Sequence, residues 1–236
     1  MNGFQSNMNQ KLTIVQVIPS LQSGGVEKGT LEIAKYLAHK GHESIVISGG
    51  GRLSEQLKKE GSTHIKWSIG KKSLFTLFYI FPVIKLIKNK KIDVIHARSR
   101  LPAWIIYLAL KFIRKSLRPL FITTVHGFNS VSMYSSIMTK GDKVIAVSKT
   151  IQKFIVQHYK VDPSKIFLNY RGVDSALYDL NKTQKTKINY SLKEEFPNLK
   201  NKIILSLPSR ISKRKEHKEF IDLIYRLKQN GLNIQG

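Results

Sequence analysis

Short apolar runs alternate with longer amphipathic segments along most of the chain. Apolar runs bounded by turn residues are typical of buried strands, and the longer segments between them are typical of helices. The predicted strands span 12–18, 42–48, 64–67, 92–96, 120–125, 143–147 and 166–169. The predicted helices span 26–40, 52–60, 73–90, 102–115 and 149–160. Because the strands are almost continuously apolar and alternate with helices, they predict an α/β fold with a parallel sheet covered on both faces.

The alternation weakens after residue 175. Residues 176–200 are polar, rich in Lys and Asn and only weakly periodic, so they predict a linker. Residues 201–236 predict one strand over 203–207, one helix and the start of a further strand. A segment of 36 residues is too short to bury a core of its own. We therefore expect a first domain over 11–175 and, over 201–236, the truncated start of a second domain.

Charge changes this picture, because the chain holds 40 Lys and Arg against 15 Asp and Glu, a formal charge of +25. Nucleic acid, an anionic membrane face and phosphorylated substrates are partners for such a chain, and a general bias toward Lys is the plain alternative. The sequence has no aromatic-studded RNA motif, zinc finger or basic zipper, so we expect no nucleic acid partner. It also has no cysteine, and its scattered histidines do not suggest a metal site. The polar N-terminal residues lack the apolar core of a signal peptide, which favours a cytoplasmic protein.

The most hydrophobic stretch of the chain is Leu74 to Ile84. It is shorter than the roughly 20 apolar residues that span a bilayer, and Pro82 interrupts it. The favoured interpretation is a helix that covers the sheet, and the alternative is a helix that lies on a membrane. Flanking lysines suited to anionic lipid are Lys71, Lys72, Lys85, Lys88, Lys90 and Lys91.

Candidate binding residues follow the predicted strands. Parallel sheets bind ligands at the carboxyl ends of their strands, so the loops 19–25, 96–102 and 126–132 should face one crevice. Gly24 and Gly25 would let the backbone approach a ligand at a helix start, although a plain turn explains them equally well. Gly49 to Gly51 is expected to be a plain loop.

Histidine and arginine side chains gather in two of these loops. His126 directly follows a strand, where it would hydrogen-bond a sugar hydroxyl or an oxygen of a departing group. The alternative is an ordinary loop histidine. The other loop contains His96, Arg98, Ser99 and Arg100, and its arginines suit an anionic donor or acceptor unless the loop is merely solvated.

A third candidate site lies in the second predicted domain. Arg210 and Lys215 fall between the strand over 203–207 and the helix that follows it. Two cations near a helix N-terminus are suited to clamp a diphosphate.

Taken in order, these segments resemble the retaining glycosyltransferases of family four, which have the GT-B fold of two facing Rossmann-like domains. The matching segments are Ile18-Pro19 through Gly24-Gly25-Val26-Glu27, Asp93 to Arg100, Thr124 to Gly127, Asp142 to Ser148, Arg171 to Asp174, and Arg210 with Lys215. Each segment is weak alone, but the ordered set covers about 11–220. The HARSR and HG segments are similar to bacterial enzymes that build lipopolysaccharide or related surface glycans.

The resemblance implies a hexosyltransferase that uses a nucleoside-diphosphate sugar, retains the anomeric configuration and needs no metal or other cofactor. It implies that Gly24 and Gly25 approach the donor phosphates and that His126 is the catalytic residue contacting the transferred sugar. Arg210 and Lys215 would neutralise the departing diphosphate, because fixed cations stabilise the charge that develops there. His96, Arg98, Ser99 and Arg100 would lie on the acceptor side.

The chain also departs from the family pattern. Ser209 and Glu216 replace the glycines that flank the Arg and Lys motif, and the family's E-x7-E motif has no counterpart in the sequence. These departures leave two hypotheses: an enzyme completed by a separate chain with the rest of the donor domain, and a truncated inactive remnant. The charge of +25 and the segment 71–91 motivate a third, a basic module for membrane or glycolipid. The first would work in the cytoplasm, in peripheral contact with the inner face of the plasma membrane.

Overall fold

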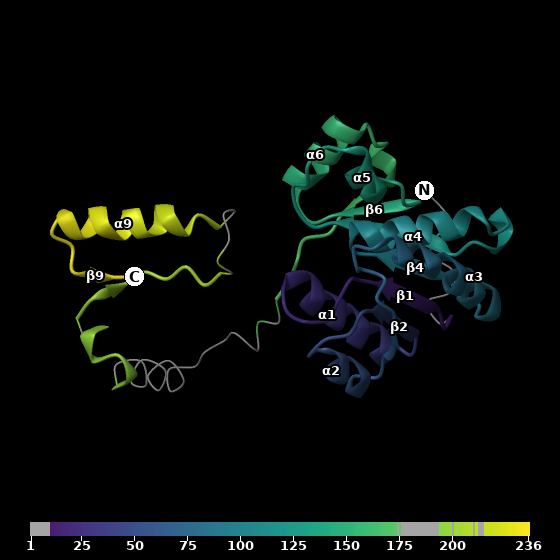
Figure 1. Cartoon of the computed structure of the whole chain (residues 1–236), viewed down its shortest axis with the longest axis horizontal. Coiled ribbons are helices and arrows are strands. Elements are labelled where there is room, and N and C mark those ends of the chain that lie inside the picture. The colour runs from purple at the N-terminus through teal and green to yellow at the C-terminus, as the bar shows by residue number, and fades with distance from the viewer. Residues whose placement is uncertain (1–9, 174, 176–193, 200, 210, 212–214) are drawn as a thin grey trace. The chain divides into compact units, whose positions relative to one another are not determined.

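The computed structural model describes residues 10–173, 175, 194–199, 201–209, 211 and 215–236. The chain divides into two units, residues 1–171 and 172–236 (Figure 1). Each unit is described by itself.

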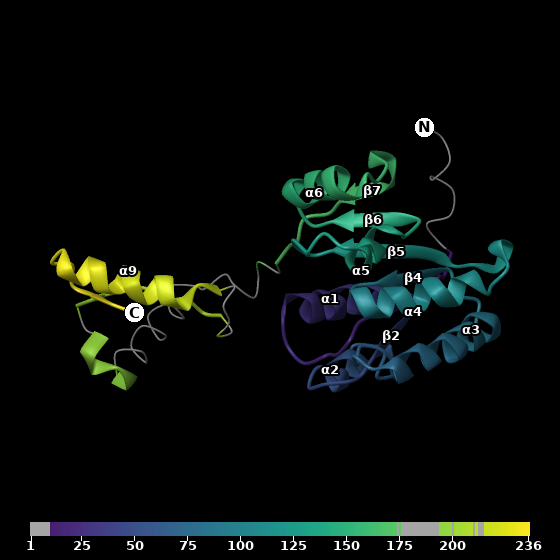
Figure 2. The ribbon, with the colours of Figure 1, turned by 45° about the horizontal axis from the view of Figure 1, so that its top comes forward.

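The first unit is built on a parallel sheet of seven strands in the order β3-β2-β1-β4-β5-β6-β7 (Figure 2). The strands are β1 (Thr13–Val17), β2 (Glu43–Ser48), β3 (Thr63–Lys66), β4 (Val94–Ala97), β5 (Leu120–Val125), β6 (Lys143–Ala146) and β7 (Ile166–Leu168). All seven predicted strands are present within a few residues of their predicted bounds. They are short and almost continuously buried, as expected for a parallel sheet covered on both faces.

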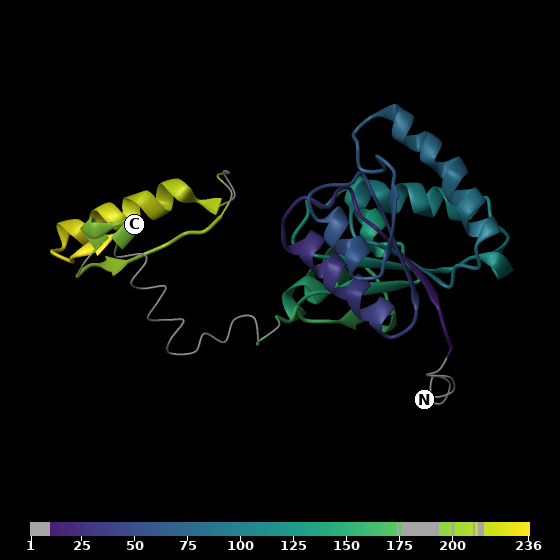
Figure 3. The same ribbon diagram turned by 90° about the horizontal axis from the view of Figure 1, so that it is seen from below.

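Helices cover both faces of this sheet. They are α1 (Gly25–His39), α2 (Ser54–Lys59), α3 (Ile80–Asn89), α4 (Arg100–Lys111), α5 (Met133–Ser136) and α6 (Lys149–Tyr159). Short 3-10 helices are η1 (Leu74–Tyr79), η2 (Lys115–Leu117), η3 (Ile137–Thr139) and η4 (Pro163–Lys165). Right-handed crossovers put α1 and α2 on one face and the later helices on the other, where α3 and α4 pack side by side (Figure 3).

Two helix predictions need correction. The helix predicted over 73–90 is divided into the 3-10 helix η1 and the α-helix α3. Ser73 caps the start of η1 by accepting a hydrogen bond from the Phe75 amide at 3.3 Å. The segment α5 was not predicted, since four residues are too few to show a helical period.

The core of the first unit lies between the sheet and its helices. Val15, Ile45 and Ile95 of the central strands pack with Ile105 of α4 and Ile155 of α6, and all five are buried. Their burial follows from the apolar runs in the sequence, because each run must be removed from water on both faces.

The second unit has few described elements. They are η5 (Pro197–Leu199), β8 (Ile203–Ile204), α9 (His217–Gln229) and β9 (Ile234–Gln235), and β8 pairs with β9 in parallel. The strand predicted over 203–207 is therefore shorter than expected. In the part of the chain that the structure describes, no helix is long and apolar enough to cross a membrane.

Candidate functional site

The candidate site lies where the strand order of the first unit reverses. The chain runs outward from β1 to β3 on one side and from β4 to β7 on the other, so β1 and β4 are neighbours. Their register places Gln16 beside His96. A crevice at the carboxyl ends of two such strands is the usual ligand site of an open α/β sheet.

His96 lies near the carboxyl end of β4, and its side chain is buried. Its Nε2 shares a hydrogen bond of 2.6 Å with the Thr124 hydroxyl of β5. Burial, followed by the nearby Arg98 and His126, holds the pKa of His96 well below its ordinary value. His96 is therefore neutral at pH 7, and it ties β4 to β5 beneath the site.

Arg98 directly follows β4 and is buried, with only 5% of its surface exposed. Its Nη1 donates a 3.2 Å hydrogen bond to Gln16 Oε1, and Gln16 Nε2 donates to the Thr30 carbonyl at 3.1 Å. The Arg98 Nε is buried and has no hydrogen-bond partner. Burial and the neighbouring Arg171 lower the pKa of Arg98 to about 10, so the guanidinium stays charged at pH 7.

His126 directly follows β5, and both of its ring nitrogens are buried without a hydrogen-bond partner. Burial, then the charges of Arg98 and Arg171, lowers its pKa to about 3. The ring is therefore neutral at pH 7, with one nitrogen free to donate and the other free to accept. Unsatisfied buried nitrogens cost free energy, so they indicate a place for a polar ligand group.

Arg171 follows β7 and supplies the second cation. Its Nη1 donates a hydrogen bond to the Gly25 carbonyl in the first turn of α1. A Cβ on Gly29 would lie 2.8 Å from Arg171 Nη2 and 3.3 Å from Arg98 Nη2. Both guanidinium groups therefore converge over Gly29, a position of α1 that has no side chain.

These groups create a positive site, although Glu32 acts on Arg98 at longer range and Glu27 lies in the first turn of α1. Within the described residues, neither Arg98 nor Arg171 forms an ion pair with a carboxylate at 4.0 Å or less. The N-terminus of α1 adds the positive end of a helix dipole. A cationic crevice that also holds a neutral histidine suits a ligand with both anionic oxygens and hydroxyl groups. The described residues include no cluster of three or more His, Asp or Glu that could hold a metal ion.

The structure brings some predicted residues together and separates others. Gly24 is the N-cap of α1 with φ of 134°, and Gly25, His96, Arg98 and His126 lie near one another at the carboxyl edge of the sheet.

Ser99 and Arg100 open the helix α4 instead. Ser99 is its N-cap, and Arg100 Nη1 donates to the Ser135 hydroxyl of α5 at 3.1 Å, with its guanidinium 5.2 Å from the Tyr134 ring. Arg100 is therefore held by α5.

The predicted diphosphate clamp lies in the second unit. Lys215 is exposed and lies just before α9, whereas Arg210 lies outside the described residues. The Ser209 hydroxyl shares a 3.2 Å hydrogen bond with His217 Nε2 at the start of α9.

Four residues of the site were not among the predicted candidates: Gln16, Gly29, Thr124 and Arg171. Two of them left a signal in the sequence. Gln16 interrupts an otherwise apolar strand, and Gly29 lies inside a helix, where glycine costs about 1 kcal/mol relative to alanine. Arg171 belongs to a segment that matched the family, but its position there did not indicate contact with Gly25.

The glycine run after β2 supports the first loop of the site. Gly51 has φ of 148°, and a Cβ there would lie 2.5 Å from the Leu21 carbonyl group. The Leu21 amide donates to the Gly50 carbonyl at 2.9 Å. This run is a loop, as predicted, and it fixes the backbone of residues 19–22.

Comparisons with known proteins give a consistent family. The sequence profile of Glycosyltransferase Family 4 matches residues 23–177. A solved glycosyltransferase from Rickettsia africae is 37% identical, with a TM-score of 0.75, over 93% of this chain and 58% of that one. A comparison with curated protein sequences gives no match.

Two further solved structures share the fold. HepE from Anabaena, in complex with UDP and glucose, is 18% identical with a TM-score of 0.71, over 91% of this chain and 58% of HepE. The lipopolysaccharide outer core galactosyltransferase WaaB is 13% identical with a TM-score of 0.50, over 69% of this chain and 46% of WaaB. The expected α/β fold class of GT-B type is thereby confirmed. The chain spans 58% or less of the length of these solved proteins.

Proposed function

Because the chain belongs to Glycosyltransferase Family 4, we propose that it serves the transfer of a hexose from a nucleoside-diphosphate sugar to a lipopolysaccharide or related surface-glycan acceptor. The observation that carries the proposal is the convergence of Arg98 and Arg171 beside the unpartnered ring of His126. A sugar bound through phosphates presents both the negative charge that the arginines attract and the hydroxyl groups that a neutral imidazole can bind.

In the proposed reaction, each group of the crevice acts on a different part of the donor. The backbone at Gly24 and Gly25 approaches the phosphates, and His126 hydrogen-bonds the transferred sugar. Breaking the bond between sugar and diphosphate places negative charge on the leaving oxygen, and cations fixed beforehand stabilise that charge. The family resemblance implies this role for Arg210 and Lys215. In the first unit, Arg98 and Arg171 supply the positive potential.

The donor and the stereochemistry are proposals with separate support. HepE, which shares the fold, was solved with UDP and glucose and with UDP-glucose, which favours a uridine nucleotide and a hexose. The resemblance to retaining family members supports retention of the anomeric configuration and a reaction without a metal cofactor. NMR of the product's anomeric proton would establish the configuration.

The acceptor and the location are further parts of the proposal. WaaB, which shares the fold, acts by its name on the lipopolysaccharide outer core. Together with the HARSR and HG segments, this favours a glycolipid acceptor at the inner face of the plasma membrane, approached from the cytoplasm.

The proposed activity needs more structure than these residues provide. Because the chain spans 58% of the length of HepE, we propose that the remaining donor-side structure completes the enzyme, from the same polypeptide or from a separate chain. The alternative is an inactive remnant that binds ligands without transferring sugar.

A thermal-shift titration with UDP, GDP and ADP sugars tests donor binding. We expect one nucleotide class to raise the melting temperature, and we expect Arg171→Ala to abolish the rise. The matched control is Arg118→Ala, because Arg118 is also exposed and also donates to a backbone carbonyl, that of Ile113 at 2.9 Å, at the opposite edge of the sheet. No shift with any donor, from a cooperatively folded chain, would contradict donor binding by this chain.

Sugar transfer is then measured with the remaining donor-side structure supplied. Transfer that depends on His126 would support the enzyme. Donor binding without transfer under these conditions would favour the remnant.

A further inference from the structure

The segment that joins β3 to β4 exposes a ridge of large apolar side chains. Leu74, Phe75, Phe78 and Phe81 are 85%, 78%, 64% and 68% exposed. Exposed clusters of this kind on a folded domain mark an interaction surface more often than isolated exposed residues do.

The ridge has a simple local cause. A 3-10 helix has about three residues per turn, so Phe75 and Phe78 of η1 project on the same side, and their rings stack at 6.3 Å. Phe81, three residues further and in the first turn of α3, extends the same spacing.

The opposite side of the segment is fixed to the core. Thr76, Val83 and Ile87 are buried there, and Tyr79 stacks on Trp67 at 5.8 Å. The sequence favoured a helix that covers the sheet, and this interpretation describes only the inner side of the segment. The core leaves the outer side exposed.

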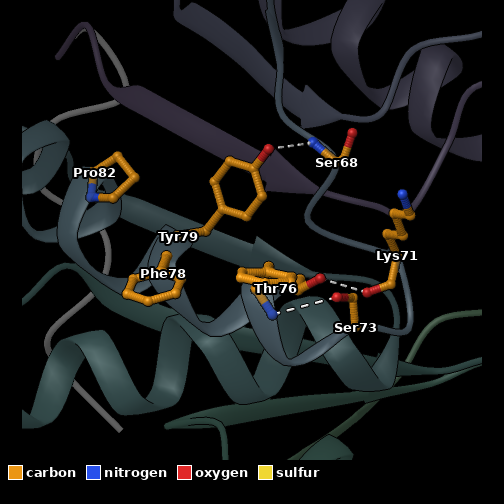
Figure 4. A pocket seen from close by; sticks show the side chains of 8 residues that line it. Ser68, Lys71, Ser73, Thr76, Phe78, Tyr79 and Pro82 are labelled. Atoms are coloured by element: carbon orange, nitrogen blue, oxygen red, sulfur yellow. Dashed lines mark hydrogen bonds between the residues drawn. The ribbon is translucent and has the colours of Figure 1, made fainter.

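A cavity of about 460 Å³ opens beside the ridge (Figure 4). It is lined by Ser68, Lys71, Ser73, Phe75, Thr76, Phe78, Tyr79 and Pro82. The Tyr79 hydroxyl accepts a hydrogen bond from the Ser68 amide at 3.0 Å, and the Thr76 hydroxyl donates to the Lys71 carbonyl at 2.5 Å. These bonds hold the wall in place, so the cavity combines a fixed polar side and a cation with apolar rings.

Charge around the ridge has one sign. No Asp or Glu occurs between Glu60 and Asp93. The exposed lysines of this interval include Lys71, Lys72, Lys85 and Lys88, and none of these four forms an ion pair within the described residues. Lys85 and Lys88 follow Phe81 by four and seven residues, so they continue the ridge along the same face of α3. Lys90 is set apart, because it pairs with Glu43.

We infer that this surface, residues 71–88, docks on an anionic lipid bilayer, with the rings of the ridge in the interface and the lysines at the headgroups. A positively charged rim around exposed aromatic side chains is the pattern that binds anionic membrane surfaces. A protein partner would need both an apolar groove for the rings and acidic residues matched to the lysines, whereas an anionic bilayer offers both features along its whole surface.

The docked orientation places the crevice at the membrane. The segment leaves β3 at the carboxyl edge of the sheet, which is also the edge that carries His126 and Arg98. The docking inference makes the proposed peripheral location more specific. It rests on the proposed function only in assuming that an acceptor binds near that edge. Vesicle binding needs no sugar transfer, so the two can fail separately.

Flotation of the whole chain with vesicles tests the inference. Phosphatidylcholine vesicles with phosphatidylglycerol should bind it, and vesicles of phosphatidylcholine alone should bind it far less. We expect Phe75→Ser with Phe78→Ser, and separately Lys72→Glu with Lys85→Glu, to weaken binding to anionic vesicles by about tenfold or more, since each basic residue near such a surface contributes about 1 kcal/mol.

The control is Phe112→Ser with Lys115→Glu. Phe112 is 71% exposed and Lys115 is also exposed, but both follow α4 at the opposite edge of the sheet. Unchanged thermal melting would establish that each variant folds.

The two test variants and the control give a clear decision. Weakening by both test variants and not by the control supports the surface. Binding that survives either test variant, an equal loss in the control, or equal binding to neutral vesicles overturns it.

A second measurement does not depend on loss of binding. Phe78→Trp should show a blue-shifted emission with anionic vesicles, relative to the unchanged chain, because the indole enters a less polar environment. Emission that does not move while the protein floats with the vesicles would place the contact elsewhere.

Discussion

The two units of the chain differ most in what they bury. In the first unit, Val15, Ile45 and Ile105 are fully removed from water, and the sheet is covered on both faces. Among the described residues of 172–236, Ile234 alone is buried, while Ile221 and Tyr225 of α9 are 66% and 64% exposed. Both units have apolar strands and an amphipathic helix, so sequence pattern alone does not provide a core. A core also needs enough neighbouring elements to surround the apolar face.

The largest expected effect on the free energy of unfolding comes from truncating one isoleucine to alanine in each unit. Ile105→Ala in α4 should lower the free energy of unfolding by about 2 to 5 kcal/mol, because it leaves a cavity in a packed core. Ile221→Ala in α9 should change it by less than about 0.5 kcal/mol, since most of that side chain is already in water. Both substitutions alter helix propensity alike, so the difference reports burial.

Urea unfolding separates the two units. Trp67 and Trp104, the two tryptophans of the chain, both lie in the first unit, so their fluorescence follows that unit alone. Far-UV circular dichroism follows both units. A large loss of stability with Ile221→Ala would mean that α9 is covered in solution, and the contrast between the units would fail.

The second effect is a pH dependence confined to the first unit. The pKa of His126 is about 3 in the folded chain, against an ordinary value of 6.5, and the pKa of His96 is also lowered. The unfolded chain therefore binds more protons, and stability falls as the pH drops from 6.5 toward 3. Each histidine contributes at most about 1.4 kcal/mol per pH unit.

His126→Gln should flatten this dependence. The control is His39→Gln, because His39 is exposed and lies outside the site. The measurement is urea unfolding followed by Trp fluorescence across the pH range. If the free energy of unfolding of His126→Gln has the same slope against pH, the ring of His126 is in contact with solvent or with a bound group.

The smallest expected effect sharpens the comparison within the first unit. Gly29→Ala should leave stability unchanged or raise it by up to about 1 kcal/mol, because alanine favours the helix. Its Cβ would displace Arg171 Nη2, which lies 2.8 Å from that position. Donor binding should therefore fall while melting temperature does not. If donor binding is retained, Arg171 does not act from the position seen in the structure.

The sequence by itself determined the sheet and the edge that carries the site. The apolar runs predicted all seven strands of the first unit, since a buried parallel strand cannot tolerate many polar residues. Once the strands are parallel, their carboxyl ends share an edge, so the loops with Gly24, Arg98 and His126 could be assigned to one crevice.

Only the tertiary structure decided which side chains meet there. Arg98 bonds Gln16 across 82 residues of sequence, and Arg171 bonds Gly25 across 146. These contacts depend on the strand order, which places β1 beside β4, and no local pattern encodes that order. Arg100, expected in the crevice, is instead held by Ser135 of the unpredicted α5. The exposed ridge at Phe75 and Phe78 has the same origin, because an apolar sequence shows that a segment avoids water but not which of its sides the core can cover.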